Sequence, residues 1–277
     1  MRHLLPALLL IAIPAVAAEP VFTEDFEHFD RKTWDEYGEA PDAVEIVDGG
    51  PSGKGKCVRI TATDGKNTGA HLYKTLDKGL DTCHLRFYVK FEKDHGYVHH
   101  FVHLCAYNPP TKWPQGGAGE RPRGDERFTT GVEPWGFWGK FDPPGAWNLY
   151  SYWCEMEKSR DGHYWGNSFA PESPVQVERD KWVCVEVMLK ANSSPDKSDG
   201  EQALWIDGKQ VGHWKNIRWR KSNDLKVNGV WMLYYITDTA WRQNRNRVKD
   251  KPASSRVWFD DIVVSESYVG PKTKDEG

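Results

Sequence analysis

The stretch Trp147–Glu157 (WNLYSYWCEME) contains the densest set of side chains that could transfer a proton or bind a sugar. If this stretch is a β-strand, its side chains alternate between two faces. Tyr150 and Tyr152 then share one face, whereas Glu155 and Glu157 share the other. One face offers two phenols and the other two carboxylates, so the face that lines a cleft decides between two chemistries.

Further charged and titratable residues precede this stretch. The segment Cys83–Phe91 (CHLRFYVKF) alternates apolar and polar residues, which predicts a strand with one polar face. The next segment, YVHHFVHLC, predicts a second strand. A hairpin of the two strands would place these groups side by side: Arg86, Tyr88, Lys90, Tyr97, His99 and His103. Because His99 and His103 would lie roughly 13 Å apart along a strand, a shared metal ion is not expected.

A long segment rich in Pro and Gly, residues 108–145, separates these predicted strands from Trp147–Glu157. A loop of this length inside a compact domain is usually functional or disordered. Its tryptophans and arginines, among them Arg121, Arg123 and Trp138, argue against disorder. We interpret the segment as a wall or lid over a cleft.

Most of the chain consists of short alternating segments separated by turn signals, such as Asp207-Gly208. No segment of useful length has the period of a helix. This pattern predicts an all-β fold, a two-sheet β-jelly roll sandwich of the concanavalin A-like lectin and glucanase type. We expect residues 19–277 to form a single domain, in which one curved sheet provides a groove for a chain-like ligand.

Residues 1–18 resemble a secretory signal peptide, with Arg2 before an apolar run and small residues at its end. We therefore expect a secreted or periplasmic protein. No later apolar segment is long enough to span a membrane, and the formal net charge of −3 gives no indication of nucleic acid or membrane binding. Fourteen tryptophans and eleven tyrosines suit stacking on sugar rings. We expect a monomer, and one or two disulfides among the five cysteines.

From about Leu85 onward, the order of motifs resembles the alginate-lyase-like jelly rolls of polysaccharide lyase family 14 and, more loosely, the glucuronan lyases. The matching motifs are the Gly116-Gly117 loop, the Y-x-Y strand, the strand that begins at Trp182, and the short hairpin at Asp207-Gly208. The resemblance implies cleavage of an acidic, uronate-containing polysaccharide by β-elimination, without a required cofactor.

The resemblance also implies roles for individual residues. The tyrosine pair, Tyr150 and Tyr152, would transfer protons, while Arg121 and a histidine, His99 or His103, would neutralise the uronate carboxylate. From the polar strand faces and the long loop, apart from the resemblance, we expect further residues to bind substrate: Arg86, Tyr88, Lys90, Tyr97, Arg123, Trp138, Trp182 and Glu186.

Three alternatives remain open from the sequence. A lectin-like carbohydrate-binding module needs only the aromatic residues. A laminarinase-like glycoside hydrolase would use Glu155 and Glu157, because paired acids about 6 Å apart suit retaining hydrolysis. A structural calcium ion could lie between the chain termini, bound by Glu24 and Asp261.

Overall fold

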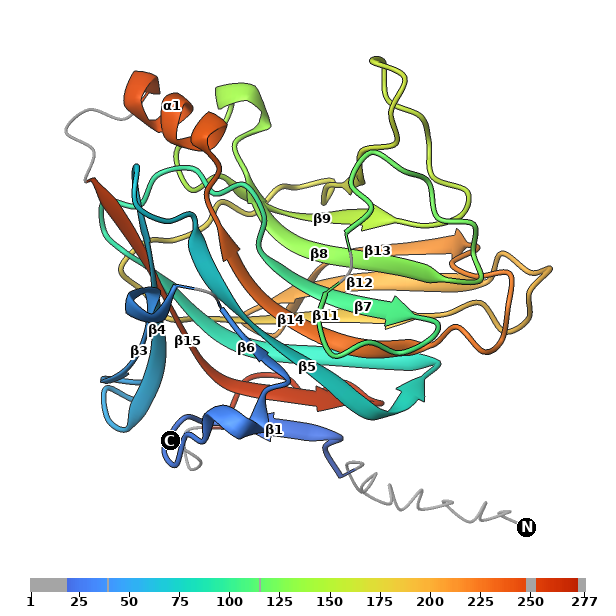
Figure 1. The fold of residues 1–277 in the computed structure, drawn as a ribbon, viewed down its shortest axis with the longest axis horizontal. Coiled ribbons are helices and arrows are strands. Elements are labelled where there is room, and N and C mark those ends of the chain that lie inside the picture. The colour runs from blue at the N-terminus through green and yellow to red at the C-terminus, as the bar shows by residue number, and fades with distance from the viewer. Residues whose placement is uncertain (1–18, 39, 115, 248–252, 274–277) are drawn as a thin grey trace, which may run out of the picture.

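Alternating apolar residues form the inner faces of two antiparallel β-sheets in the computed structural model, which describes residues 19–38, 40–114, 116–247 and 253–273 (Figure 1). The predicted all-β jelly roll sandwich is confirmed. The predicted signal peptide, residues 1–18, lies outside the described residues.

The seven-stranded sheet faces the viewer in Figure 1, and the eight-stranded sheet lies behind it. The seven-stranded sheet has the order β10 (Asn167–Phe169), β9 (Ala146–Tyr152), β8 (Arg127–Trp135), β7 (Val102–Tyr107), β14 (Val227–Tyr235), β5 (Gly69–Leu80) and β2 (Glu36–Tyr37). The eight-stranded sheet has the order β13 (Lys209–Ile217), β12 (Gly200–Ile206), β11 (Val183–Lys190), β6 (Thr82–Phe91), β15 (Ser254–Ser265), β4 (Lys56–Thr63) and β3 (Val44–Asp48), with β1 (Phe22–Glu24) paired to β15.

The core lies between the two sheets. On β6, the residues predicted to face inward are all buried: Leu85, Phe87, Val89 and Phe91. The ring of Phe101 packs 5.3 Å from Phe91 and 5.2 Å from Phe259, measured between centroids. Such aromatic contacts add to the free energy of burying apolar area.

The polar strand β6 and the histidine-bearing strand β7 belong to different sheets, so the predicted hairpin between them is wrong. The chain crosses from one sheet to the other between Phe91 and Val102, and β7 begins only at Val102. His99 and His103 therefore do not share one strand face. Alternation along each strand is a local property, whereas the choice of partner strand depends on long-range packing.

Two further elements differ from the sequence expectation. Part of the predicted loop at residues 108–145 is β8, which pairs with both β7 and β9. The chain also contains a helix, α1 (Asp238–Arg247). Thr237 precedes it, and the Thr237 Oγ1 accepts a hydrogen bond from the backbone N–H of Ala240. This helix is short and mostly polar, so it lacks a clear apolar period. Within the described ranges, no helix is long and apolar enough to cross a membrane.

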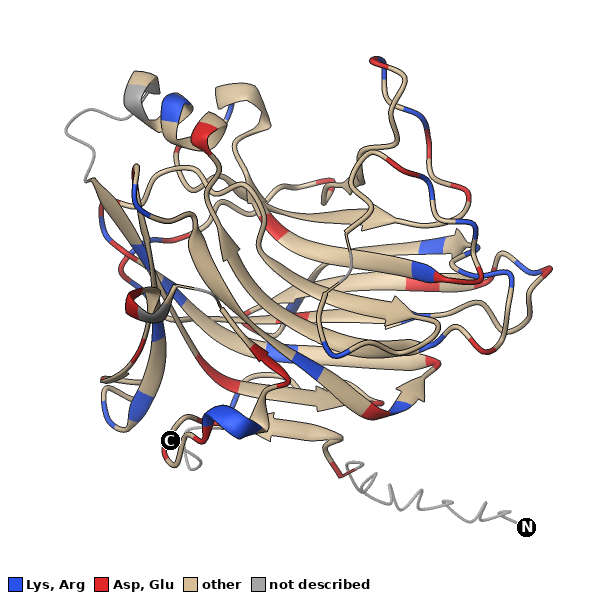
Figure 2. Cartoon of the chain, viewed as in Figure 1, with Lys and Arg blue, Asp and Glu red and all other residues tan. Residues whose placement is uncertain are grey.

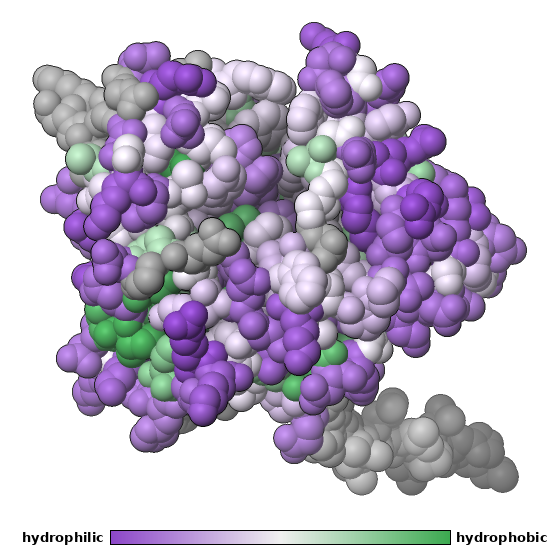
Figure 3. Space-filling model, in the orientation of Figure 1, coloured by the Kyte–Doolittle hydropathy of each residue, from purple (hydrophilic) through white to green (hydrophobic). Residues whose placement is uncertain are grey.

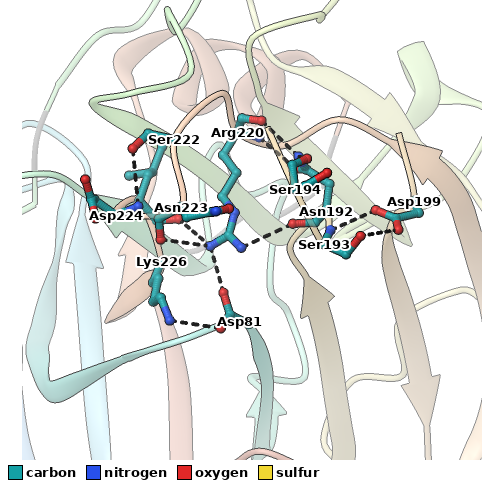
Figure 4. A network of polar contacts seen from close by, with 11 residues as sticks. Asp81, Asn192, Ser193, Ser194, Asp199, Arg220, Ser222, Asn223, Asp224 and Lys226 are labelled. Carbon is teal, nitrogen blue, oxygen red and sulfur yellow. Dashed lines mark hydrogen bonds and ion pairs between the residues drawn. The ribbon is translucent and has the colours of Figure 1, made fainter. Parts of the chain in front are cut away.

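A polar network around Arg220 joins the ends of three connections (Figure 4). The buried Arg220 guanidinium donates to the backbone carbonyls of Leu225 and Asn192 and pairs with Asp81 at 2.7 Å. The Asn192 side chain, also buried, accepts the Arg220 N–H and donates to the Ser194 carbonyl. The network links the β5–β6 corner, the β11–β12 turn and the segment before β14, and so connects both sheets.

We expect Arg220→Met to lower the free energy of unfolding by about 3 kcal/mol, because it leaves buried carbonyl groups without donors. The matched control is Lys226→Ala, because Lys226 also pairs with Asp81 but at the surface. That variant should lose less than about 1 kcal/mol. Urea denaturation measures both values, and equal losses would contradict a special role for the buried network.

Candidate functional site

Two tyrosines on β9 point to the outer face of the seven-stranded sheet. Tyr150 and Tyr152 line one hollow, while Trp147 and Leu149, on the other face of the same strand, are buried in the core. The two hydroxyl oxygens lie 3.4 Å apart, and the Tyr150 hydroxyl accepts the backbone N–H of Gly166 at 2.8 Å. Burial, followed by the contact with Tyr152, raises the pKa of Tyr150 well above its ordinary value, so this phenol stays protonated.

His103 on β7 lies beside this pair and is neutral. Its Nδ1 donates to the Phe101 carbonyl at 2.6 Å, which leaves Nε2 as an acceptor. Burial lowers the pKa of His103 to about 4. The ring lies over Gly131 of β8, where a Cβ atom would come within 2.6 Å of Nε2. A residue without a side chain is therefore needed opposite His103.

His100 and Glu133 form an ion pair at the same site, with 2.8 Å between Nδ1 and Oε1. Burial alone would lower the pKa of His100, but the charge and hydrogen bond of Glu133 outweigh it and raise that pKa. The His100 ring is parallel to Tyr235 and lies 5.7 Å from Tyr150. The site thus contains a histidine whose cationic form is favoured by Glu133 next to a histidine whose neutral form is favoured by burial.

Arg127, the first residue of β8, provides the arginine of the site. Its guanidinium lies over the Tyr152 ring and donates to the carbonyls of Gly117 and Glu120. Gly117 has a φ of +111°, and a Cβ atom there would lie 2.5 Å from Arg127 Nη2. The Gly116-Gly117 motif therefore permits both the turn and the close approach of the arginine.

These groups surround one hollow of about 150 Å³. It is lined by His100, His103, Tyr107, Gly116, Gly117, Ala118, Arg127, Thr129, Tyr150, Tyr152, Trp231 and Leu233. Tyr150 and His103, which could transfer protons, thus share one partly closed space with Arg127 and with His100, whose cationic form Glu133 favours. This arrangement suits removal of a proton next to a carboxylate.

Of the predicted catalytic residues, the structure brings Tyr150, Tyr152 and His103 together. His99 lines a neighbouring hollow beyond His100. Arg121 is exposed, stacks on Tyr164 and lines a third hollow at the opposite end of the site. Arg123 is also exposed there and pairs with Asp125.

Sequence reasoning missed Arg127, His100 and Glu133. Arg127 and Glu133 lie in the stretch that was interpreted as loop, although alternation from Arg127 to Glu133 (RFTTGVE) indicates a strand with both residues on one face. His100 belongs to the irregular backbone before Val102, where strand alternation does not indicate the direction of a side chain. Phe101, the next residue, is buried in the core.

The prediction that five further residues line the same groove is wrong, because they lie on the outer face of the other sheet: Arg86, Tyr88, Lys90, Trp182 and Glu186. Lys90 lies over the rings of Trp182 and Trp258. Glu186 is buried, pairs with His84 at 2.8 Å and accepts the backbone N–H groups of Val269 and Gly270. Glu186 therefore connects the C-terminal segment to β11.

The remaining two predicted binding residues belong to connections near the groove. Tyr97 is buried, and its hydroxyl donates to the Phe141 carbonyl at 2.9 Å, so the expectation of a groove-lining Tyr97 is wrong. Trp138 is 83% exposed and packs against Trp135, which lines the hollow beyond His100. Trp138 itself lines none of the three hollows of this face.

The carboxylate pair of the hydrolase alternative does not form. β9 ends at Tyr152, so strand alternation does not extend to Glu155 and Glu157. Both glutamates are exposed, and Glu155 pairs with Arg218 at 3.0 Å.

The predicted disulfides are absent, because all five cysteines are free and buried: Cys57, Cys83, Cys105, Cys154 and Cys184. The calcium site stays a prediction. β1 and β15 do bring the two ends of the chain together, with Glu24 opposite Ile262. However, Glu24 accepts hydrogen bonds from Phe26 and Trp34, and Asp261 pairs with Lys272.

Comparison with solved structures places this sandwich among known folds. The alginate lyase Aly36B matches with a TM-score of 0.61 and 16% identity over 92% of this chain and 100% of that chain. The alginate lyase vAL-1 from Chlorella virus matches with a TM-score of 0.62 and 14% identity over 85% and 94%. An endo-β-1,4-glucuronan lyase from the fungus Trichoderma reesei has a TM-score of 0.57 and 17% identity over 90% and 96%. The chain has the fold of these polysaccharide lyases. No protein-family model and no curated protein matches the sequence.

Proposed function

We propose that this protein is a secreted polysaccharide lyase that cleaves a uronate-containing polysaccharide by β-elimination. The observation that carries the proposal is the convergence of Tyr150, His103, His100 and Arg127 on one hollow. The lyase fold supports it, as does an Aly36B variant whose structure contains an alginate tetrasaccharide. The expected signal peptide supports secretion.

In the proposed reaction, Arg127 and His100, in the cationic form that Glu133 favours, bind the uronate carboxylate and stabilise the negative charge that develops on it. Arginine suits this role because its planar guanidinium holds carboxylates with paired hydrogen bonds. Arg127 takes the role that the sequence assigned to Arg121, which lies outside this hollow.

His103 Nε2 accepts the C5 proton, because its low pKa keeps this nitrogen unprotonated. Glu133, 3.8 Å away, stabilises the imidazolium that forms. Tyr150 donates its proton to the leaving glycosidic oxygen, a role that suits a phenol with a raised pKa. Tyr152 orients the Tyr150 hydroxyl. The C4–O bond breaks, a C4–C5 double bond forms, and a new reducing end is released.

The test is a screen of uronate, sulfated and neutral glycans, followed by absorbance near 235 nm. Elimination produces an unsaturated uronate that absorbs there. Hydrolysis would produce reducing ends without this absorbance, and a lectin would bind without producing either. Binding of uronate polymers with no unsaturated product would overturn the proposal.

The histidine pair predicts a bell-shaped pH profile of kcat/KM. Activity should fall below about pH 4, where His103 becomes protonated. It should also fall as the pH rises through the pKa of His100, which Glu133 raises above its ordinary value of 6.5. Glu133→Gln removes the cause of that raised pKa, so the alkaline limb should move to lower pH. An alkaline limb at the same pH in this variant would contradict the assignment to His100.

The raised pKa of His100 also affects the stability of the fold. Because the folded-state pKa of His100 is raised, its ion pair with Glu133 stabilises the fold below pH 6.5 and is lost as pH rises through the folded-state pKa. The difference in melting temperature between wild type and Glu133→Gln should therefore shrink at alkaline pH.

A further inference from the structure

Three hollows adjoin along the outer face of the seven-stranded sheet and form one groove. The hollow with the tyrosine pair shares Tyr107 and Arg127 with a larger one of about 850 Å³. On its other side it shares His100 and Tyr150 with one of about 290 Å³. The surface of this side of the molecule is mostly hydrophilic (Figure 3). A polysaccharide lying in the groove would contact all three hollows.

The larger hollow forms the basic end of the groove. Its lining includes four cations and two acids: Lys112, Arg121, Arg123, Arg127, Glu120 and Glu126. Lys112 and Arg121 are exposed to the solvent in which a ligand would arrive. This excess of positive charge suits sugars that carry carboxylates.

The smaller hollow forms the opposite end, beside α1, and differs in charge. Its described lining includes no lysine or arginine, and His100 is paired there with the carboxylate of Glu133. His99 is neutral because burial and the charge of His100 lower its pKa to about 4. Neutral polar side chains of Ser168, Thr239 and Gln243 complete the wall. In Figure 2, β8 carries a cation at one end and an acid at the other. The charge along β8 therefore changes in the same direction as the charge along the groove.

Asn148 provides an independent observation at this end. Its side chain is 1% exposed and lines the smaller hollow, yet its buried Oδ1 has no hydrogen-bond partner. A buried polar atom without a partner is costly unless a ligand satisfies it. Asn148 lies opposite Glu133 in the β8–β9 register, so a carboxylate would meet both a negative charge and an unpaired acceptor. A sugar hydroxyl would satisfy this acceptor.

We propose that the smaller hollow is a subsite for a neutral sugar and that the substrate is a mixed polysaccharide with neutral sugars adjacent to uronates. The uronate whose C4–O bond breaks lies at the tyrosine pair, a neutral sugar lies against Asn148, and further uronates lie at the basic end. This inference rests on the proposed lyase function.

The test compares two sets of oligosaccharides of equal length, one of uronates only and one in which uronates alternate with neutral hexoses. We expect kcat/KM, followed at 235 nm, to be about tenfold to hundredfold higher for the mixed set, because a second carboxylate would be unpaired beside Glu133. Equal or faster cleavage of the all-uronate set would overturn the subsite but leave the lyase function intact. Absence of unsaturated product from both sets, and from the wider glycan screen, would overturn the lyase function itself.

A charge variant tests the subsite directly. Gln243 is exposed on α1, so Gln243→Arg should fold normally and place a cation in the smaller hollow. We expect it to raise kcat/KM for the all-uronate set about tenfold and to reduce the preference for the mixed set. Gln243→Met, of similar size and without charge, should not raise it. An unchanged preference in Gln243→Arg would contradict the proposed subsite.

Discussion

Tyr150→Phe is expected to lower kcat for β-elimination by a factor of about 10² to 10⁴, the range associated with loss of a general acid. The substitution removes only the hydroxyl that would protonate the leaving oxygen. The ring keeps its place beside His100 and Gly166, so substrate affinity should change little. Initial rates at 235 nm and binding of the same oligosaccharide by calorimetry separate the two effects.

Two variants control this result. Tyr152→Phe removes the neighbouring hydroxyl at 3.4 Å and should cause a smaller loss, about tenfold, if Tyr152 only orients Tyr150. Glu155→Gln should retain nearly full activity, because Glu155 is exposed and pairs with Arg218 away from the hollow. Release of reducing ends without absorbance at 235 nm, lost in Glu155→Gln and retained in Tyr150→Phe, would favour the hydrolase alternative.

Arg127→Gln is expected to reduce kcat by a factor of about 10² to 10³, the size of effect seen when one preorganised donor to a developing anion is removed. Arg127→Lys restores the charge but not the planar pair of donors, and should recover only part of the activity. Arg127→Gln also removes the hydrogen bonds from the guanidinium to the carbonyls of Gly117 and Glu120, which hold the loop in place. A kcat decrease with unchanged KM indicates loss of transition-state stabilisation, whereas a KM increase alone indicates that the arginine only orders the loop.

Arg121→Gln is the matched control for Arg127. Arg121 belongs to the same loop region but lies over Tyr164, outside the central hollow. Its loss should raise KM for anionic oligosaccharides by a few-fold and leave kcat nearly unchanged. If Arg121→Gln reduced kcat more than Arg127→Gln, the assignment made from the sequence would be preferred over the one made from the geometry.

The sequence alone predicted the sandwich and that Tyr150 and Tyr152 share one face of a strand. Both predictions depend on alternation along a single strand, which requires only local backbone geometry. Leu85 and Phe87 face the core as expected, and Tyr150 and Tyr152 face outward together. The Gly116-Gly117 signal was also informative, because Gly117 allows the loop to approach Arg127.

Only the tertiary structure decided which polar groups meet those tyrosines. Arg86 and Lys90 lie on a well-predicted strand, but β6 joins the other sheet and directs them to the far side of the molecule. Arg127 and Glu133 reach the site because β8 pairs between β7 and β9, across many residues of intervening chain. Strand pairing depends on burial of both inner faces at once. Local periodicity therefore specified which side chains share a face of each strand. Long-range packing specified which residues of other strands lie beside Tyr150 and Tyr152.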